Sequence, residues 1–233
     1  MLIGGIQKTT LIDYPSKIAC TVFLGGCNFR CPFCYNSELV LPEKLKKIER
    51  VKEKDFFNFL EQRKGLLEGV CICGGEPTIH TDLPEFIQKI KKMGFLVKLD
   101  TNGSNPDMIK KLIKENLLDY IAMDIKAPLN EESYNKAVNV KINLEKIKES
   151  VKIIKNSDVL YEFRTTVVPN IHTKEDIIQI AKDISPAKNY FLQNFQSTKN
   201  LDSNFEKVKP YDKEFLIEIK KSISSYFDFC EVR

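Results

Sequence analysis

Short apolar runs alternate with segments of helical periodicity along most of the chain, and this alternation constrains the fold more than any other feature. The apolar runs, rich in residues that favour β-structure, are 18–24, 70–73, 95–99, 120–123, 159–168 and 189–192. The segments predicted as helices are 55–64, 82–93, 106–116, 143–156, 173–184 and 212–225. Strands that alternate with helices form parallel sheets, because each right-handed crossover packs its helix against the sheet. We therefore predict an α/β fold of successive β–α units, with an edge strand at 227–232.

Individual residues support the helix boundaries. Pro84 falls in the first turn of the second predicted helix, and Gly94 follows its last turn. Thr173 and Asp176 have the spacing of a capping box. The helix predicted at 143–156 places its apolar residues on one face, at Leu144, Ile147, Val151 and Ile154. A longer loop is expected at 127–142.

The chain of 233 residues is long enough for a single domain with a substantial core. We expect the core of this domain at about 18–195, followed by a C-terminal helix and edge strand at about 211–233. No apolar run approaches the ~18 residues that a membrane-spanning helix needs. The first eight residues lack the charged start and the small-residue cleavage site of a signal peptide, so a cytoplasmic location is expected.

The charges do not indicate a nucleic-acid partner. The net charge is +4, from 36 basic and 32 acidic residues that are interspersed. Lysines cluster at 44–47, 89–92 and 146–155, but no aromatic residues are interleaved there as stacking platforms for bases. These clusters are typical of solvated helix faces.

Three of the seven cysteines fall close together, in the pattern Cys27-x3-Cys31-x2-Cys34. An odd number of cysteines without a secretory signal favours reduced thiols that bind a metal over a disulfide framework. Soft thiolates select iron–sulfur clusters, zinc or copper(I). Structural zinc sites and purely electron-carrying cubane clusters use four protein ligands, so three cysteines leave one metal corner open for a substrate. A zinc site completed by a distant fourth cysteine is the alternative.

Polar residues lie in or just after each predicted strand, near its C-terminal end. They are the three cysteines, Gly74-Gly75-Glu76, Asp100-Thr101-Asn102, Asp124 with Lys126, Arg164 to Thr166, and Gln193. Ligands bind at this edge of β/α barrels and of open α/β sheets. Arg164 lies within an apolar strand, where its charge needs a partner. We therefore predict that these segments converge on one site.

The cysteine motif, followed by Gly74-Gly75-Glu76-Pro77, resembles the radical S-adenosylmethionine superfamily. The stretches GGIQKTTLIDYPSK, FLGGCNFRCPFCYNSELV, LDTNGS and MDIKAP resemble the activating proteins of glycyl-radical enzymes. Within that group, the likeness is to the activating proteins of anaerobic ribonucleoside-triphosphate reductase and of pyruvate formate-lyase. The resemblance implies a partial (βα)6 TIM-like barrel with mostly parallel strands.

The resemblance also implies the cofactors. Cys27, Cys31 and Cys34 would bind three irons of a [4Fe–4S] cluster, and the fourth iron would be left to S-adenosylmethionine. The residues implied to bind S-adenosylmethionine are Phe33, Gly74, Gly75, Glu76, Asp100, Thr101, Asn102, Asp124, Lys126, Arg164 and Gln193. The glycine turn suits the methionine ammonium, the segment 100–102 suits the ribose, and Lys126 and Arg164 suit the methionine carboxylate. Asp124 would orient Lys126 or join Asp100 in holding a monovalent cation.

Phe33 and Tyr35 are candidates to flank the adenine, although simple packing beside the cluster would also explain them. The other cysteines, Cys20, Cys71, Cys73 and Cys230, are expected to behave as small buried hydrophobic residues. His80 and His172 are isolated in the sequence, and loop or cap positions suit them.

The implied function is a radical S-adenosylmethionine enzyme that takes a hydrogen atom from a glycine of a partner glycyl-radical enzyme. A flavodoxin or a ferredoxin-type protein is the implied electron donor, and no membrane is involved. Two alternatives remain: a radical S-adenosylmethionine enzyme acting on a small molecule or a tRNA base, as in deazapurine synthesis, and a non-enzymatic zinc or iron–sulfur module. The segments 127–142 and 195–210 should distinguish an open mouth for a peptide loop from an enclosed pocket for a small molecule.

Overall fold

The computed structural model describes residues 1–233 and contains one eight-stranded sheet whose strands follow the order of the sequence. The strands are β1 (Ile3–Thr10), β2 (Ala19–Leu24), β3 (Gly69–Gly74), β4 (Leu96–Thr101), β5 (Tyr120–Asp124), β6 (Leu160–Val167), β7 (Ala187–Asn194) and β8 (Phe227–Val232). Strands β2 to β8 are parallel to their neighbours, and β1 is antiparallel to β2. Because β8 does not pair with β1, the sheet is an open, partial barrel. The predicted α/β class with mostly parallel strands is confirmed.

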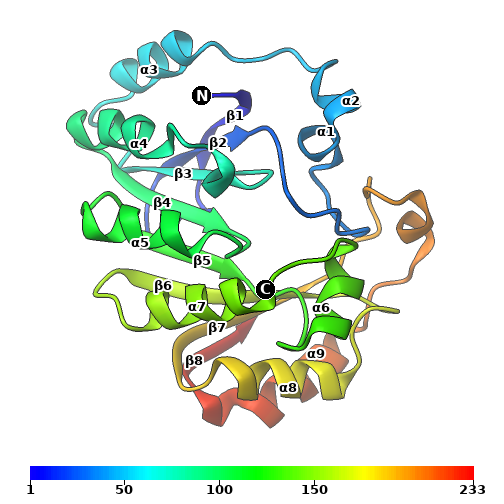
Figure 1. Cartoon of the computed structure of the whole chain (residues 1–233). Helices are drawn as coiled ribbons and strands as arrows, with labels where there is room; N and C mark the ends of the chain where they lie inside the picture. The colour runs from blue at the N-terminus through cyan, green and yellow to red at the C-terminus, as the bar shows by residue number, and fades with distance from the viewer.

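The six predicted helices are present and follow one another around the outside of the sheet (Figure 1). They are α3 (Glu53–Gln62), α4 (Leu83–Lys92), α5 (Pro106–Lys114), α7 (Leu144–Lys155), α8 (Lys174–Ile184) and α9 (Lys213–Ile223). Shorter elements fill the connections: α1 (Ser37–Val40), α2 (Pro42–Leu45), α6 (Glu131–Val138), η1 (Pro77–Ile79), η2 (Ser203–Lys207) and η3 (Ser224–Tyr226). In Figure 1, α1 and α2 lie together at the upper right of the view, and α6 lies below them. No helix has the length and apolar character that crossing a bilayer requires.

The local signals of the sequence explain several helix ends. Thr173 and Asp176 form the predicted capping box of α8, in which each side chain accepts a hydrogen bond from the other residue's backbone N–H. The predicted apolar face of α7 is buried, with Leu144, Ile147 and Val151 packed in the main hydrophobic cluster. In α7 and α8, a side-chain hydrogen bond at the N-cap and a buried apolar face together hold the helix in its place against the sheet.

Besides the other short elements in the connections, strand β1 and helix α6 were not predicted. Strand β1 has two glycines and a polar end, so it carries no apolar run, yet it pairs with β2 along one edge of the sheet. Helix α6 lies inside the segment 127–142, where a loop was expected. The side chain of Asn130 caps α6 by accepting a hydrogen bond from Ser133 N–H, and Asn139 ends it in the left-handed conformation with φ of 52°. The predicted edge strand at 227–232 is confirmed as β8, parallel to β7.

Candidate functional site

One cavity of about 800 Å³ is lined by every residue that the sequence predicted for the site. Those residues are Cys27, Cys31, Phe33, Cys34, Gly74, Gly75, Glu76, Asp100, Thr101, Asn102, Asp124, Lys126, Arg164 and Gln193. They come from segments that are distant in the sequence but follow neighbouring parallel strands. The cavity also reaches Ile12 and Pro15 after β1, and Arg233 after β8, so its lining extends to both edges of the open sheet.

The cysteine loop follows β2 and is fixed by backbone hydrogen bonds to distant segments. Gly26 N–H donates to the carbonyl oxygen of Leu39 at 2.7 Å, and Arg30 N–H donates to that of Val138, at the end of α6, at 2.9 Å. The guanidinium of Arg30 donates to the carbonyl oxygen of Cys27 at 2.7 Å. The loop conformation is therefore set by the protein itself, and the thiols face one cavity.

The three thiols suit a metal cluster better than free thiol chemistry. Burial raises the pKa of Cys27 to about 11 and that of Cys31 to about 12, and it also raises the pKa of Cys34. Thiols with such pKa values stay protonated near neutrality unless a metal binds them as thiolates. The side chains do not converge as ligands of one metal ion. A cluster does not need that convergence, because each thiolate binds a different iron.

The glycine turn after β3 lies directly against the cysteine loop. Gly74 has φ of 119°, in the region that favours glycine, and a Cβ atom on Gly75 would lie 1.9 Å from the carbonyl oxygen of Gly26. The contact brings Glu76 N–H to within 2.8 Å of that same carbonyl oxygen. From the other side, the Asn36 side chain donates to the carbonyl oxygen of Gly74 at 2.9 Å. Two glycines are needed here because two backbone segments touch.

Glu76 is buried, with 1% of the residue exposed, and joins the glycine turn to the end of β4. Its Oε1 accepts hydrogen bonds from Thr78 N–H at 3.1 Å, Thr78 Oγ1 at 2.5 Å and Thr101 Oγ1 at 2.7 Å. Its Oε2 accepts one from Asn102 N–H at 2.6 Å. Burial raises the pKa of this carboxyl group against the opposing effect of these hydrogen bonds. Much of the carboxylate's hydrogen-bonding capacity is therefore used inside the protein.

The end of β4 is also tied to the cysteine loop. The side-chain amide of Asn102 donates to Asn28 Oδ1 at 3.0 Å, and Asn28 Nδ2 lies 2.8 Å from Ser104 Oγ. Asn28 lies between two of the cysteines. Three segments of the site, after β2, β3 and β4, thus form one hydrogen-bonded unit.

Another part of the cavity lining is a network of alternating charges. The guanidinium of Arg164 bridges two carboxylates, with Nε 2.9 Å from Asp124 Oδ1 and Nη1 3.1 Å from Asp100 Oδ2. Lys126 Nζ lies 3.0 Å from Asp124 Oδ2, and Lys98 pairs with Asp100. Burial would raise the pKa of Asp124, but the charges of Arg164 and Lys126 prevail and lower it to about 2. Both carboxylates are therefore charged, and each holds a cationic side chain in place.

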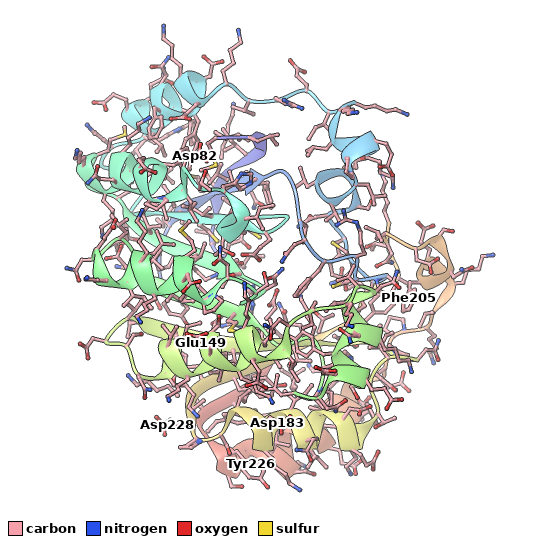
Figure 2. All side chains as sticks on the ribbon, viewed as in Figure 1. Asp82, Glu149, Asp183, Phe205, Tyr226 and Asp228 are labelled. Atoms are coloured by element: carbon pink, nitrogen blue, oxygen red, sulfur yellow. The ribbon has the colours of Figure 1, made fainter.

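Aromatic residues cover the cysteine loop. Phe33 is buried and meets the His172 ring edge-on, at 6.5 Å between ring centroids. Tyr35 is 42% exposed, stacks on Phe195 at 6.3 Å, and accepts a hydrogen bond from Gln196 N–H at 2.8 Å through its hydroxyl. Phe205, in η2, packs edge-on against Phe195, and Figure 2 shows it on the same side of the molecule as α1 and α6.

Sequence reasoning missed the role of His172. It is 2% exposed, accepts a hydrogen bond from Val168 N–H through Nδ1 at 3.0 Å, and donates through Nε2 to the carbonyl oxygen of Lys126 at 2.8 Å. His172 therefore supports the segment that carries Lys126. A loop position was expected for it, and it does precede the N-cap of α8, but nothing in the sequence indicated this burial.

Glu162, Arg233 and Cys73 also line the cavity without having been predicted there. Glu162 precedes Arg164 by two residues, so the period of a strand could have placed both on one face. The remaining cysteines Cys20, Cys71 and Cys230 are buried as expected, whereas Cys73 is only partly buried. Its position just before the glycine turn brings it to the cavity wall.

The chain is similar to several known proteins. The family profile described as Radical SAM superfamily matches residues 21–184. A Methanocaldococcus jannaschii protein, provisionally named a glycyl-radical enzyme activating enzyme, is 35% identical over 100% of this chain and 95% of its own length. The 7-carboxy-7-deazaguanine synthase of Aquifex aeolicus is 37% identical over 40% of this chain and 39% of its own. The solved structure of QueE from Escherichia coli shares the fold, with a TM-score of 0.55, 15% identity, and coverage of 98% of this chain and 92% of that one.

Proposed function

The chain belongs to the radical S-adenosylmethionine superfamily, and from that premise we propose that it is the activating enzyme of a glycyl-radical enzyme. The observation that carries the proposal is the 35% identity, over 100% of this chain, to a protein provisionally named as such an activating enzyme. The match to the deazaguanine synthase covers only 40% of the chain.

The residues of the site suit the cofactors of this family. Three thiols in one cavity match three irons of a [4Fe–4S] cluster, and the donors and acceptors beside them match an amino acid and a ribose. When bound, the cluster and S-adenosylmethionine supply a one-electron reductive cleavage that yields an organic radical for hydrogen abstraction. The protein supplies the binding, the orientation and the exclusion of water.

Each wall of the cavity has a proposed role in holding S-adenosylmethionine. The glycine turn offers backbone carbonyl groups to the methionine ammonium, and the segment from Asp100 to Asn102 faces the ribose. Lys126 and Arg164 are the cations for the methionine carboxylate, which Arg can bind with two parallel hydrogen bonds. The proposed role of Glu76 is indirect, because its carboxylate oxygens accept hydrogen bonds from Thr101 and Asn102 and hold these residues in place. The proposed contacts to the adenine come from Phe33, Tyr35 and Gln193.

Asp100 and Asp124 stay candidates for a monovalent cation, since both are charged and face the cavity. In the structure, each of them already pairs with side-chain cations. Activity measured in potassium, sodium and a bulky organic cation would test whether an added metal ion contributes.

The shape of the site supports a peptide loop as the substrate. The cavity runs to residues at both edges of the sheet, Ile12 after β1 and Arg233 after β8, and these edges do not join. The two segments expected to shape the mouth, 127–142 and 195–210, each contact the cysteine loop. The carbonyl oxygen of Val138 accepts a hydrogen bond from Arg30 N–H, and Asp202 N–H donates one to the carbonyl oxygen of Pro32. An open mouth suits a glycine carried on a loop of another protein, and anaerobic ribonucleoside-triphosphate reductase is the first candidate. A flavodoxin or ferredoxin-type protein would supply the electron.

The deciding experiment is anaerobic. The reconstituted and reduced protein is incubated with S-adenosylmethionine and a candidate reductase, and both 5′-deoxyadenosine and a glycyl-radical signal in electron paramagnetic resonance are measured. Both products are expected. Deoxyadenosine without a glycyl signal on any candidate would favour the small-molecule alternative. A protein that forms no deoxyadenosine and binds only zinc would fit the non-enzymatic module.

A further inference from the structure

Glu162 is a buried acidic residue inside the partial barrel. It has no part in the proposed contacts to the cofactors. It lies on β6 with 1% of its side chain exposed. Tyr120 donates its hydroxyl to Oε2 at 3.0 Å. A carboxylate in such a place needs a cation, because an unpaired buried charge is strongly unfavourable.

Arg233 supplies that cation through a two-pronged contact. Its Nη1 lies 3.1 Å from Glu162 Oε1, and its Nη2 lies 3.1 Å from Oε2. The guanidinium also lies over the Phe191 ring, 3.3 Å from the centroid. Its backbone N–H donates to the carbonyl oxygen of Leu192 at 2.8 Å, so the side chain leaves from a fixed point of the sheet. Lys cannot replace Arg in this contact, because only the planar guanidinium can form two parallel hydrogen bonds to a carboxylate and also stack on an aromatic ring.

A second cation is close enough to compete for the same carboxylate. Nη1 of Arg164 is 3.9 Å from Glu162 Oε1 and 3.1 Å from Asp100 Oδ2. Arg164 therefore sits between two carboxylate groups that both attract it. With Arg233 bound to Glu162, the balance favours Asp100 and Asp124; without Arg233, Glu162 would have Arg164 as its nearest cation.

We propose that Arg233 is a positioning residue for the S-adenosylmethionine site: by neutralising Glu162, it keeps the guanidinium of Arg164 on Asp100 and Asp124. Arg164 in turn fixes Asp124, whose second oxygen holds Lys126. The chain of contacts runs from Arg233 to the two cations proposed for the methionine carboxylate. The inference rests on that proposed role of Arg164 and Lys126, and it is independent of which substrate the radical attacks.

The test measures binding of S-adenosylmethionine to the anaerobically reconstituted protein by equilibrium titration, with the melting temperature recorded for each variant. R233M should raise the dissociation constant about tenfold or more, the size of coupling seen between neighbouring charged groups. The double variant E162Q/R233M removes both charges and leaves Tyr120 an acceptor, so it should restore the constant to within about threefold of the wild type. In steady-state cleavage, R233M should raise KM for S-adenosylmethionine more than it lowers kcat.

The matched control is K220M, which removes the α9 cation that pairs at 2.7 Å with Glu231 on β8, two residues before Arg233; neither Lys220 nor Glu231 lines the cavity. It should leave the dissociation constant unchanged. Unchanged binding in R233M, or binding in E162Q/R233M that stays as weak as in R233M, would overturn the proposal. So would unchanged binding in R164Q, since Arg233 is held to act through Arg164. If R233M does not fold, R233K takes its place, because Lys cannot reproduce the two-pronged contact. Binding in R233K as tight as in the wild type, or binding in E162Q/R233M that is tenfold weaker than in the wild type, overturns the proposal. A failure of the glycyl-radical function shows instead as a missing glycyl signal while binding of S-adenosylmethionine is intact.

Discussion

Thr101 Oγ1 donates a hydrogen bond to Glu76 Oε1 at 2.7 Å, and this contact joins the turn after β3 to the end of β4. The neighbouring residue, Asn102, adds a backbone hydrogen bond to Oε2 at 2.6 Å. The Glu76 side chain therefore sets the distance between two segments that are both proposed to touch S-adenosylmethionine. Its structural effect should be separable from any direct contact with the ligand.

The first prediction concerns Glu76→Gln. An amide of the same shape turns one acceptor into a donor, and every contact of this side chain needs an acceptor. We expect the free energy of unfolding to fall by about 1–3 kcal/mol, the usual cost of a buried donor left unsatisfied. Anaerobic denaturant titration measures this loss, and Glu85→Gln, an exposed residue on α4, is the control that should change little. Equal stabilities of E76Q and E85Q would contradict the assigned role.

The second prediction concerns the contact between the glycine turn and the cysteine loop. A methyl group at Gly75 would lie 1.9 Å from the Gly26 carbonyl oxygen, a backbone atom that cannot turn aside. Gly75→Ala should therefore lower the free energy of unfolding by about 3 kcal/mol, the upper end of the usual cost of overpacking, and reduce the iron bound per chain. Gly5→Ala is the control, because a Cβ atom there meets nothing within 4 Å. Iron analysis and thermal melting give the readouts, and normal iron content in G75A would count against this packing.

The third prediction tests the ligand set. Cys31→Ala should abolish the visible absorption of the reconstituted cluster and the formation of deoxyadenosine, because two thiolates cannot hold the cluster in the proposed way. Cys230→Ala removes a buried thiol outside the cavity and should retain both. Absorption and iron content are compared after identical reconstitution. Should C31A keep deoxyadenosine formation, the assignment of Cys31 as a ligand would be wrong.

The fold was largely predictable because strands β2 to β7 are short apolar runs with helical segments between them. Strand β1 escaped prediction since its polar residues Gln7, Lys8 and Thr9 are exposed at a sheet edge. Helix α6 was not predicted because its buried residues, Tyr134, Ala137 and Val138, span only about one and a half turns of helix within a polar stretch. Edge elements draw their stability from tertiary pairing, which a local pattern does not contain.

The site was predictable in position but not in its contacts. The rule that ligands bind at the C-terminal ends of parallel strands brought the cysteine motif, the glycine turn and Arg164 to one place. It could not show that Glu76 points at Thr101, or that Arg233 approaches Glu162, because these pairs are 25 and 71 residues apart in the chain. Such partners meet only when the strands assemble into the sheet, so their roles stay predictions that the variants above address.

The last prediction concerns pH and follows from His172. Burial lowers the pKa of this side chain, although its hydrogen bond to the Lys126 carbonyl oxygen acts in the opposite direction. The folded protein therefore binds fewer protons at His172 than the unfolded chain. The stability that depends on neutral His172 is fully present above the unfolded pKa of about 6.5 and is lost as the pH falls below it.

We expect the free energy of unfolding of the wild type to drop between pH 7 and pH 5 with an added slope of at most about 1.4 kcal/mol per pH unit, the limit for one proton. His172→Gln can still accept from Val168 N–H and donate to the Lys126 carbonyl oxygen, but it does not titrate. Its stability should therefore change less over the same range, even if it is lower at pH 7. Anaerobic denaturant titrations at several pH values give both curves, and His80→Gln separates the contribution of the other histidine, whose pKa is also lowered by burial. Parallel curves for the wild type and H172Q would mean that the His172 ring accommodates a proton in the folded state, which its two hydrogen bonds do not permit without breaking the one from Val168.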